Sequence, residues 1–217
     1  MRRSRRKPNP AERFVRDLLG FRGFNRASAA TELRAAGGAI VPVVVNEFWT
    51  AKQRAGHALH EISYRACFKP ALPRFFIERL TKPGDLVYDP FMGRGTTLIE
   101  ATLLGRRCAG CDINPVTRVF VEPRLRPPSI EAVETRLNEV ELEWSGEVWR
   151  ELDVFYHSRT LRELTALWEY FLACKRVGFL DVVDRWIRMV VVNRLTGHSS
   201  GFFSVYTFLP NQAVTIE

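Results

Sequence analysis

The sequence predicts an α/β fold built on the first half of a doubly wound, nucleotide-binding sheet, followed by a helical segment. Residues 86–112 follow the order strand, Gly-rich loop, helix, strand, acidic residue, which is typical of such a half-sheet. The 217 residues are 46% hydrophobic and 26% charged, which suits one globular domain and excludes a disordered or fibrous chain. No apolar run reaches the ~18 residues that a membrane span requires.

The N-terminal arm, residues 1–26, concentrates the positive charge of the chain. It holds nine Lys or Arg and two acidic residues, so it carries +7 of the formal net charge of +8. Residues 1–10 contain two prolines and are expected to be disordered. Such an arm suits sequence-independent contact with nucleic-acid phosphates, although a solvated tail without a ligand has the same composition. The candidate phosphate contacts are Arg2, Arg3, Arg5, Arg6 and Lys7.

Hydrophobic spacing and turn residues predict the elements in chain order. Before the Gly-rich loop we expect helices over residues 11–19 and 27–36, a strand over 40–45 interrupted by Pro42, and a helix over 70–81. The half-sheet consists of a strand over 86–88, a helix over 96–104 and a strand over 107–111. Further helices are expected over 129–144, from Thr160 to about residue 175 on capping-box spacing, and over 180–195. The apolar run from Phe202 to Phe208 needs a surface to pack against, which suggests that the domain continues beyond Glu217.

The Gly-rich loop, DPFMGRGTT over residues 89–97, is the segment that indicates a ligand. Its glycines let the backbone turn sharply and approach a ligand closely. A phosphate-binding P-loop would have Lys-Ser/Thr after the second Gly, and a dinucleotide fingerprint would have a third Gly at Leu98. S-adenosylmethionine carries an ammonium group that suits an acid at the strand end, Asp89, and ribose hydroxyls that suit Asp112, 23 positions later. The predicted cofactor is therefore S-adenosylmethionine.

These residues resemble a known family. DPFMGRGTT, the following LIEATLLGRRCAGCDINP and the upstream Phe68-Lys69-Pro70 are similar to the cofactor motifs of amino-methylating DNA methyltransferases, over residues 57–120. The resemblance implies a class I methyltransferase fold with a Rossmann-like sheet, S-adenosylmethionine as cofactor, and methylation of cytosine N4 or adenine N6 in DNA. It implies that Lys69 and Pro70 cradle the methionine end, that Asp112 holds the ribose and that Ile113 faces the adenine. The cofactor loop is assigned to Asp89, Pro90, Phe91, Gly93, Gly95 and Thr96.

Two departures from the family pattern affect the expected activity. Arg94 stands where the family has a small residue, so the loop is shaped differently or the side chain points outward. The catalytic motif, Asp/Asn/Ser-Pro-Pro-aromatic, is missing. The Pro127-Pro128 pair lies between Arg126 and Ser129, which suits a loop before a helix. We therefore expect a cofactor-binding part that binds its cofactor better than it transfers methyl groups.

Several interpretations follow for the chain as a whole. It is a truncated gene product or one subunit of a split cytoplasmic enzyme, with DNA and a second polypeptide as partners. An RNA base methyltransferase and a catalytically inactive cofactor-binding or DNA-binding remnant are the alternatives. The expected organisation is an arm over residues 1–26, a cofactor-binding α/β region over 27–122, and a helical segment with an apolar tail over 123–217.

Cysteine and histidine residues point to no other chemistry. Cytosine C5 methylation requires a Pro-Cys nucleophile, and none of the four cysteines follows a proline. Four cysteines also do not make a disulfide framework, so a reducing compartment is expected. Cys108 and Cys111 have the spacing of metal ligands, but they lack a second pair and lie on a predicted strand, which favours a place in the core. His57 and His60 are expected to be structural.

Overall fold

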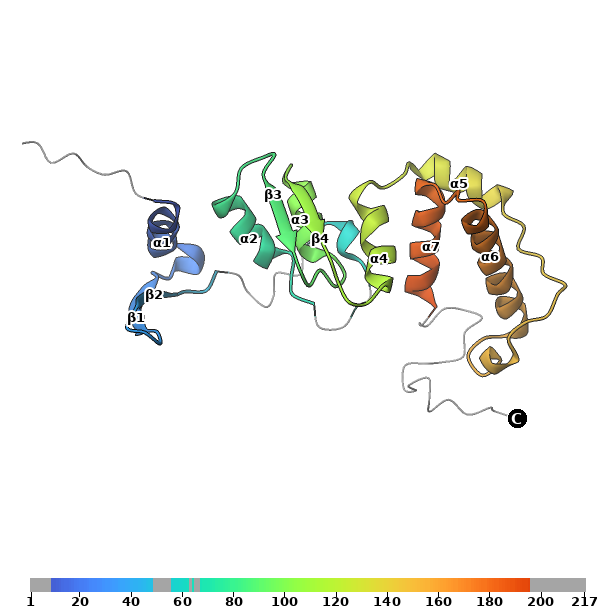
Figure 1. The fold of residues 1–217 in the computed structure, drawn as a ribbon, viewed down its shortest axis with the longest axis horizontal. Coiled ribbons are helices and arrows are strands. Elements are labelled where there is room, and N and C mark those ends of the chain that lie inside the picture. Colours follow the sequence, from blue (N-terminus) through green and yellow to red (C-terminus); the bar gives the residue numbers. More distant parts are fainter. Residues whose placement is uncertain (1–8, 49–55, 63, 65–66, 196–217) are drawn as a thin grey trace, which may run out of the picture. The chain divides into compact units, whose positions relative to one another are not determined.

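The computed structural model describes residues 9–48, 56–62, 64 and 67–195, and the chain forms two compact units (Figure 1). The first unit consists of Met1–His60, Ala66–Met92 and Thr96–Cys111. The second consists of Glu61–Arg65, Gly93–Gly95 and Asp112–Glu217. The boundary expected at residue 122 stays a prediction. The arm residues Arg2 to Lys7 and the apolar run 202–208 lie outside the described residues.

The first unit begins with a helix and a β-hairpin. Helix α1 (Pro10–Gly20) starts at a capping box, in which Asn9 and Glu12 exchange side-chain to backbone hydrogen bonds of 2.8 and 3.0 Å. A short 3₁₀ helix, η1 (Gly23–Asn25), follows. Strands β1 (Ala29–Arg34) and β2 (Ile40–Val45) then pair antiparallel, with Ala29 opposite Val45 and Arg34 opposite Ile40.

The helix predicted over residues 27–36 is therefore wrong, whereas the strand predicted over 40–45 is confirmed. The physical reason is the pair Gly37 and Gly38, whose φ values of 90° and 82° reverse the chain in a tight turn. This turn brings residues 29–34 beside the β-branched strand β2, and the ladder of backbone hydrogen bonds outweighs local helix propensity. Pro42 lies opposite Glu32 in a two-stranded sheet, where the missing N–H is tolerated.

The rest of the first unit is the predicted half-sheet. Helix α2 (Ala71–Leu80) precedes strand β3 (Leu86–Asp89), helix α3 (Thr96–Leu103) and strand β4 (Arg107–Gly110). The strands pair in parallel, with Leu86 opposite Arg107 and Asp89 opposite Gly110. Their parallel pairing across a helix confirms the strand–loop–helix–strand order, because parallel neighbours need such a crossover.

The core of the first unit lies under α3. Leu98, Ile99 and Ala101 are at most 3% exposed. Beside them the buried carboxylate of Glu100 accepts a hydrogen bond of 2.7 Å from His60 Nε2 and one of 3.3 Å from Arg74. His60 belongs to a 3₁₀ helix, η2 (Ala58–His60), which this contact holds against α3. The structural role expected for His60 is confirmed, because burying a carboxylate requires such partners.

The second unit is helical. It contains α4 (Val116–Leu125), α5 (Ile130–Glu139), a 3₁₀ helix η3 (Arg150–Leu152), α6 (Ser158–Arg176) and α7 (Val182–Arg194). Helix α4 was not among the predicted elements, and it carries Pro123 in its last turn. One apolar cluster joins Ile62, Phe120 and Met189. Another joins the buried side chains of Phe171, Val183 and Ile187.

Three helix boundaries in the second unit differ from the prediction. Helix α5 ends at Glu139 instead of residue 144, where Trp144 Nε1 donates 2.9 Å to the carbonyl of Glu147 in a local turn. Helix α6 begins two residues before Thr160, with His157 at the N-cap position, so the predicted capping box is wrong. Helix α7 starts at a capping box between Asp181 and Asp184 that replaces the predicted start at residue 180.

A buried ionic cluster ties α5, α6 and α7 together. Arg136 of α5 donates to Asp184 of α7 and, at 2.9 Å, to Asp181. Tyr170 of α6 donates its hydroxyl to Asp184 at 2.8 Å, and Asp184 is only 1% exposed. The hydrogen bonds to Asp181 and Asp184 raise the pKa of Arg136, and burial raises the pKa of Tyr170. The cluster therefore links three helices through one arginine, one tyrosine and two aspartates.

Within the described ranges, no helix is both long enough and apolar enough to cross a membrane.

Removing the buried carboxylate of Asp184 tests how much the ionic cluster of α5, α6 and α7 contributes to stability. Asp184→Ala is expected to lower the free energy of unfolding by about 3 kcal/mol, because a partly buried guanidinium and a hydroxyl lose their shared buried acceptor. The matched control is Glu163→Ala, which removes an exposed pair with Arg159 and should cost at most about 0.5 kcal/mol. Urea unfolding of both variants measures the difference. Equal losses in the two variants would contradict a stabilising role for the buried cluster.

Candidate cofactor site

The predicted cofactor loop begins at the carboxyl end of the parallel sheet. Asp89 ends β3, and its Oδ1 accepts a hydrogen bond of 3.0 Å from the backbone N–H of Phe91. The N–H of Cys111 donates to the carbonyl of Asp89 at 3.1 Å, and the N–H of Met92 donates to the carbonyl of Cys111 at 3.0 Å. These bonds fix the loop to the ends of both strands, which is where doubly wound sheets bind their ligands.

Apolar side chains within this loop and after strand β4 are exposed. Phe91 is 85% exposed, and Ile113, which follows the acid after β4, is fully exposed. Pro90 is also exposed. Large apolar side chains in solvent often mark a surface that a ligand or further protein covers.

Asp112 holds the first glycine of the Gly-rich loop, Gly93, in place. Its Oδ2 accepts 2.8 Å from the backbone N–H of Gly93, and its Oδ1 accepts 2.9 Å from the N–H of Asn114. The bond from Asn114, followed by that from Gly93, lowers the pKa of the Asp112 carboxyl below its ordinary value. The group is therefore ionised at neutral pH, and a carboxylate has lone pairs left for further donors such as ribose hydroxyls.

Gly95 is a position that only glycine fits. Its φ is +80°, in the left-handed region that L side chains rarely adopt. A Cβ there would lie 2.5 Å from Cγ2 of Val121 in α4, well inside contact distance. The loop backbone thus packs directly on α4, which explains why the motif has glycine here.

Arg94 lies between the two glycines and is held within the second unit. Its Nη1 donates 3.2 Å to the carbonyl of Ile62, so the alternative in which Arg94 points outward is wrong. The carbonyl of Arg94 accepts a hydrogen bond from Arg124, which is 2% exposed and also donates 2.6 Å to the carbonyl of Phe120. Burial, together with the charge of Arg94, lowers the pKa of Arg124 to about 10.

Arg124 is a site-supporting residue that the sequence pattern did not reveal. It is the arginine of the segment VFVEPRL, in which Glu122 is the other charged residue. Its guanidinium braces the backbone of the Gly93–Gly95 segment through the carbonyl of Arg94. A charged residue inside an apolar stripe is the signal that points to such a role.

The remaining predicted contacts lie at helix starts of the first unit. Thr96 is the first residue of α3 and is 3% exposed. Pro70 is the N-cap residue of α2, and the carbonyl of Lys69 accepts 3.0 Å from the N–H of Leu72. Of the ten predicted cofactor contacts, six belong to the first unit and four to the second. Their individual roles toward a cofactor stay predictions.

The other candidate groups do not form a second site. Pro127-Pro128 lies in the segment between α4 and α5, as expected for a loop. Cys108 is partly buried on β4, but Cys111 is exposed, so its expected place in the core is wrong. Its Sγ lies 3.3 Å from the hydroxyl of Tyr88, and this contact raises the pKa of Tyr88. In the part of the chain that the structure describes, no three His, Cys, Asp or Glu side chains form a metal-binding group.

Comparison with known proteins shows what part of the chain is similar to. Residues 27–118 match a family model of N6/N4 methyltransferases described as DNA methylase. The Type II methyltransferase M.MjaII of Methanocaldococcus jannaschii is 35% identical over 80 residues, covering 37% of this chain and 15% of that protein. M1.MboII of Moraxella bovis, also a Type II methyltransferase, is 54% identical over 46 residues, covering 19% of this chain and 18% of that protein.

A further relative has a different substrate in its name. The tRNA (guanine(10)-N2)-dimethyltransferase of Methanocaldococcus jannaschii is 42% identical over 57 residues, covering 26% of this chain and 16% of that protein. The chain thus spans only about a sixth of the length of these relatives. No solved structure matches it. The resemblance to amino-methylating DNA methyltransferases is confirmed over residues 27–118, which are similar to N6/N4 DNA methylases.

The packing of Gly95 on Val121 can be tested by comparison with Gly178, a glycine that has a similar positive φ. Gly178→Ala places a Cβ at φ +72° in open space and should cost about 1 kcal/mol of left-handed strain. Gly95→Ala adds the collision with Val121 and should lower the free energy of unfolding by about 2–4 kcal/mol in total. Urea unfolding measures both.

A double variant isolates the collision. Gly95→Ala with Val121→Ala should recover stability relative to Gly95→Ala with Val121 intact, because the added methyl group gains room. If Gly95→Ala costs no more than Gly178→Ala, the close approach of the loop to α4 is not a constraint.

Proposed function

We propose that this chain supplies the cofactor-binding part of an S-adenosylmethionine-dependent DNA amino-methyltransferase, and that its sheet is the start of a class I methyltransferase fold. The observation that carries the proposal is the Gly-rich loop, which joins parallel strands β3 and β4 through α3 and is followed by Asp112. The match of residues 27–118 to a DNA methylase family model supports it.

The residues present suit the proposed cofactor. Gly95 has no side chain, and any Cβ there would collide with Val121. A ligand can therefore approach the loop backbone closely. The carboxylate of Asp112 would accept the ribose hydroxyls, and Asp89 would pair with the ammonium of the methionine end. Ile113 and Phe91 would cover apolar parts of the ligand. When bound, S-adenosylmethionine supplies an activated methyl group on its sulfonium.

The remaining contacts follow the resemblance. Lys69 and Pro70 stand at the start of α2, where they would cradle the methionine end, and Thr96 begins α3. Arg94 and Arg124 are positioning residues, because they brace the loop backbone through carbonyl groups and need not touch the cofactor.

The proposed substrate is an amino group of a DNA base. The Type II methyltransferases among the relatives favour DNA, and the basic arm over residues 1–26 suits a nucleic-acid substrate. The tRNA-modifying relative keeps RNA as a second candidate, because it is 42% identical to this chain over 57 residues. No Asp/Asn/Ser-Pro-Pro-aromatic motif occurs in the 217 residues, so the acceptors that orient the target amine would come from polypeptide outside them.

Cofactor binding is tested by calorimetry with S-adenosylmethionine. Asp112→Ala should weaken binding by about 1–3 kcal/mol, roughly 5- to 150-fold in Kd, because the ribose hydroxyls lose their acceptor. Asp112→Asn keeps one of the two oxygens that accept from the backbone N–H groups of Gly93 and Asn114, so it should weaken binding less than Asp112→Ala. Asp153→Ala is the matched control, since Asp153 follows η3 and lies outside the motif. Equal affinity of the wild type and both Asp112 variants would contradict the assignment.

Methyl transfer is tested with labelled S-adenosylmethionine and mixed-sequence DNA or tRNA. The chain alone should give background counts, because methyl transfer needs the amine held in line with acceptors aimed at its developing charge. Adding a polypeptide that carries the missing motif should restore transfer to DNA, but not with the Asp112→Ala chain. Robust methylation of DNA by the chain alone would show an unrecognised acceptor group, and transfer to tRNA in place of DNA would favour the RNA candidate.

A further inference from the structure

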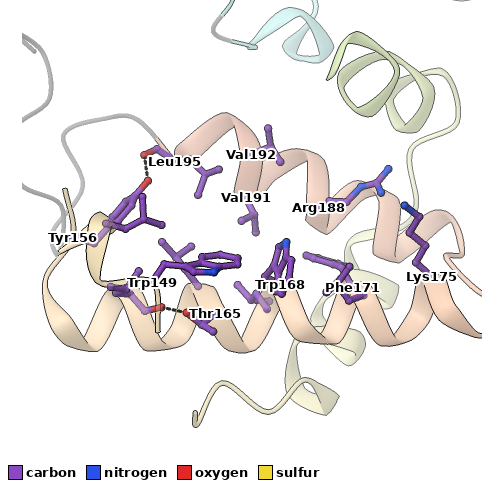
Figure 2. Close-up of a pocket in the computed structure, with 15 residues that line it drawn as sticks. Trp149, Tyr156, Thr165, Trp168, Phe171, Lys175, Arg188, Val191, Val192 and Leu195 are labelled. Carbon is purple, nitrogen blue, oxygen red and sulfur yellow. Dashed lines mark hydrogen bonds between the residues drawn. The ribbon is translucent and has the colours of Figure 1, made fainter. Parts of the chain in front are cut away.

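The second unit contains an apolar pocket of about 460 Å³ between α6 and α7 (Figure 2). Trp168 and Phe171 point into it from α6, and Val191 points into it from α7. Trp149 closes one wall, with its ring centroid 4.6 Å from that of Trp168 in an edge-on arrangement. The methyltransferase motif contributes no residue to this pocket.

The pocket favours an apolar occupant. The hydroxyl of Tyr156 already donates 2.7 Å to the carbonyl of Leu195, and that of Thr165 donates 2.8 Å to the carbonyl of Leu161. Both hydroxyls therefore already donate their hydrogen bonds to backbone carbonyls of the chain. Trp149 is 44% exposed and Trp168 is 42% exposed, so two indole rings remain open to solvent. An aromatic surface of this kind marks a site that another apolar group covers.

The chain itself supplies a segment of matching composition. Residues 202–208, FFSVYTF, lie outside the described residues, and five of these seven side chains are apolar or aromatic. Leu195, the last described residue, lines the pocket, so the segment begins seven residues from its wall.

The tether is long enough for this segment to reach the whole pocket. Seven residues span up to roughly 25 Å when extended. The stretch of α6 that lines the pocket, from Leu161 to Lys175, rises about 21 Å. A segment held by such a short tether has an effective concentration in the millimolar range, which favours it over a separate molecule of equal intrinsic affinity.

We propose that residues 202–208 dock into the pocket between α6 and α7 of the same chain and cover Trp149 and Trp168. This contact goes beyond the proposed methyltransferase function and does not rest on it. It adds to the apolar layer of the helical unit a segment that begins eight residues after the end of α7.

Acrylamide quenching of tryptophan fluorescence in the full chain tests the docking. The triple variant Phe202→Ser, Phe203→Ser, Phe208→Ser should show a larger quenching constant and a red-shifted emission maximum, because both indoles become more accessible. The polar variant Asn211→Ala, Gln212→Ala is the matched control and should behave like the wild type. In a Trp149→Phe, Trp168→Phe background the triple variant should cause no further change. Wild-type quenching in the triple variant overturns the proposal.

Photo-crosslinking gives a second measurement that does not depend on the triple variant folding. A benzoylphenylalanine introduced at position 203 of the full chain should crosslink to α6 or α7 within a monomeric band, and mass spectrometry locates the modified peptide. Crosslinks elsewhere in the chain overturn the proposal. So does a crosslink found only in a dimeric band, or tryptophan protection that is lost on dilution, because either result would place the segment on a second copy.

Discussion

The carboxylate of Asp112 is the group on which the geometry of the cofactor loop depends. It accepts backbone N–H groups from Gly93 and Asn114, which are 21 positions apart in the sequence. One side chain thus sets both the turn at the second half of the Gly-rich loop and the start of the segment that leads into α4. Both donors are backbone N–H groups, and their hydrogen bonds favour the charged form of the carboxylate. Two further contacts fix the rest of this segment against α4. Gly95 packs on Val121, and Arg124 donates a hydrogen bond to the carbonyl of Arg94.

The sequence allowed the half-sheet to be predicted almost to the residue. Leu86–Asp89, Thr96–Leu103 and Arg107–Gly110 form as expected, because each boundary has a local cause in a Gly, Pro or Asp. The prediction for residues 27–36, which contain the first strand of the hairpin, failed for the opposite reason. This strand has no clear strand pattern of its own, and it forms because Gly37 and Gly38 turn it onto a strong strand. Pairing across a turn outweighed the propensity of the segment.

The side chains that support the Gly-rich loop were harder to predict than the loop itself. The motif indicated Asp89, Gly93, Gly95 and Asp112 from spacing alone. The bracing arginine could not be found this way, since Arg124 lies 30 positions from the carbonyl that it holds. Likewise, Arg136 is separated from Asp184 by 48 positions, and only the packing of α5 beside α7 brings them together. Long-range polar partners depend on the tertiary arrangement, which a local pattern does not encode.

The buried contact between His60 and Glu100 has a practical consequence for work at different ionic strengths. Both side chains are at most 6% exposed, so mobile ions cannot approach them, and salt screens such a contact far less than an exposed pair. Exposed pairs such as Arg159 with Glu163, and any contact with phosphate groups, weaken as salt is added. A salt titration of nucleic-acid binding by this chain therefore reports on the encounter with phosphate, while the core beneath α3 keeps its contacts.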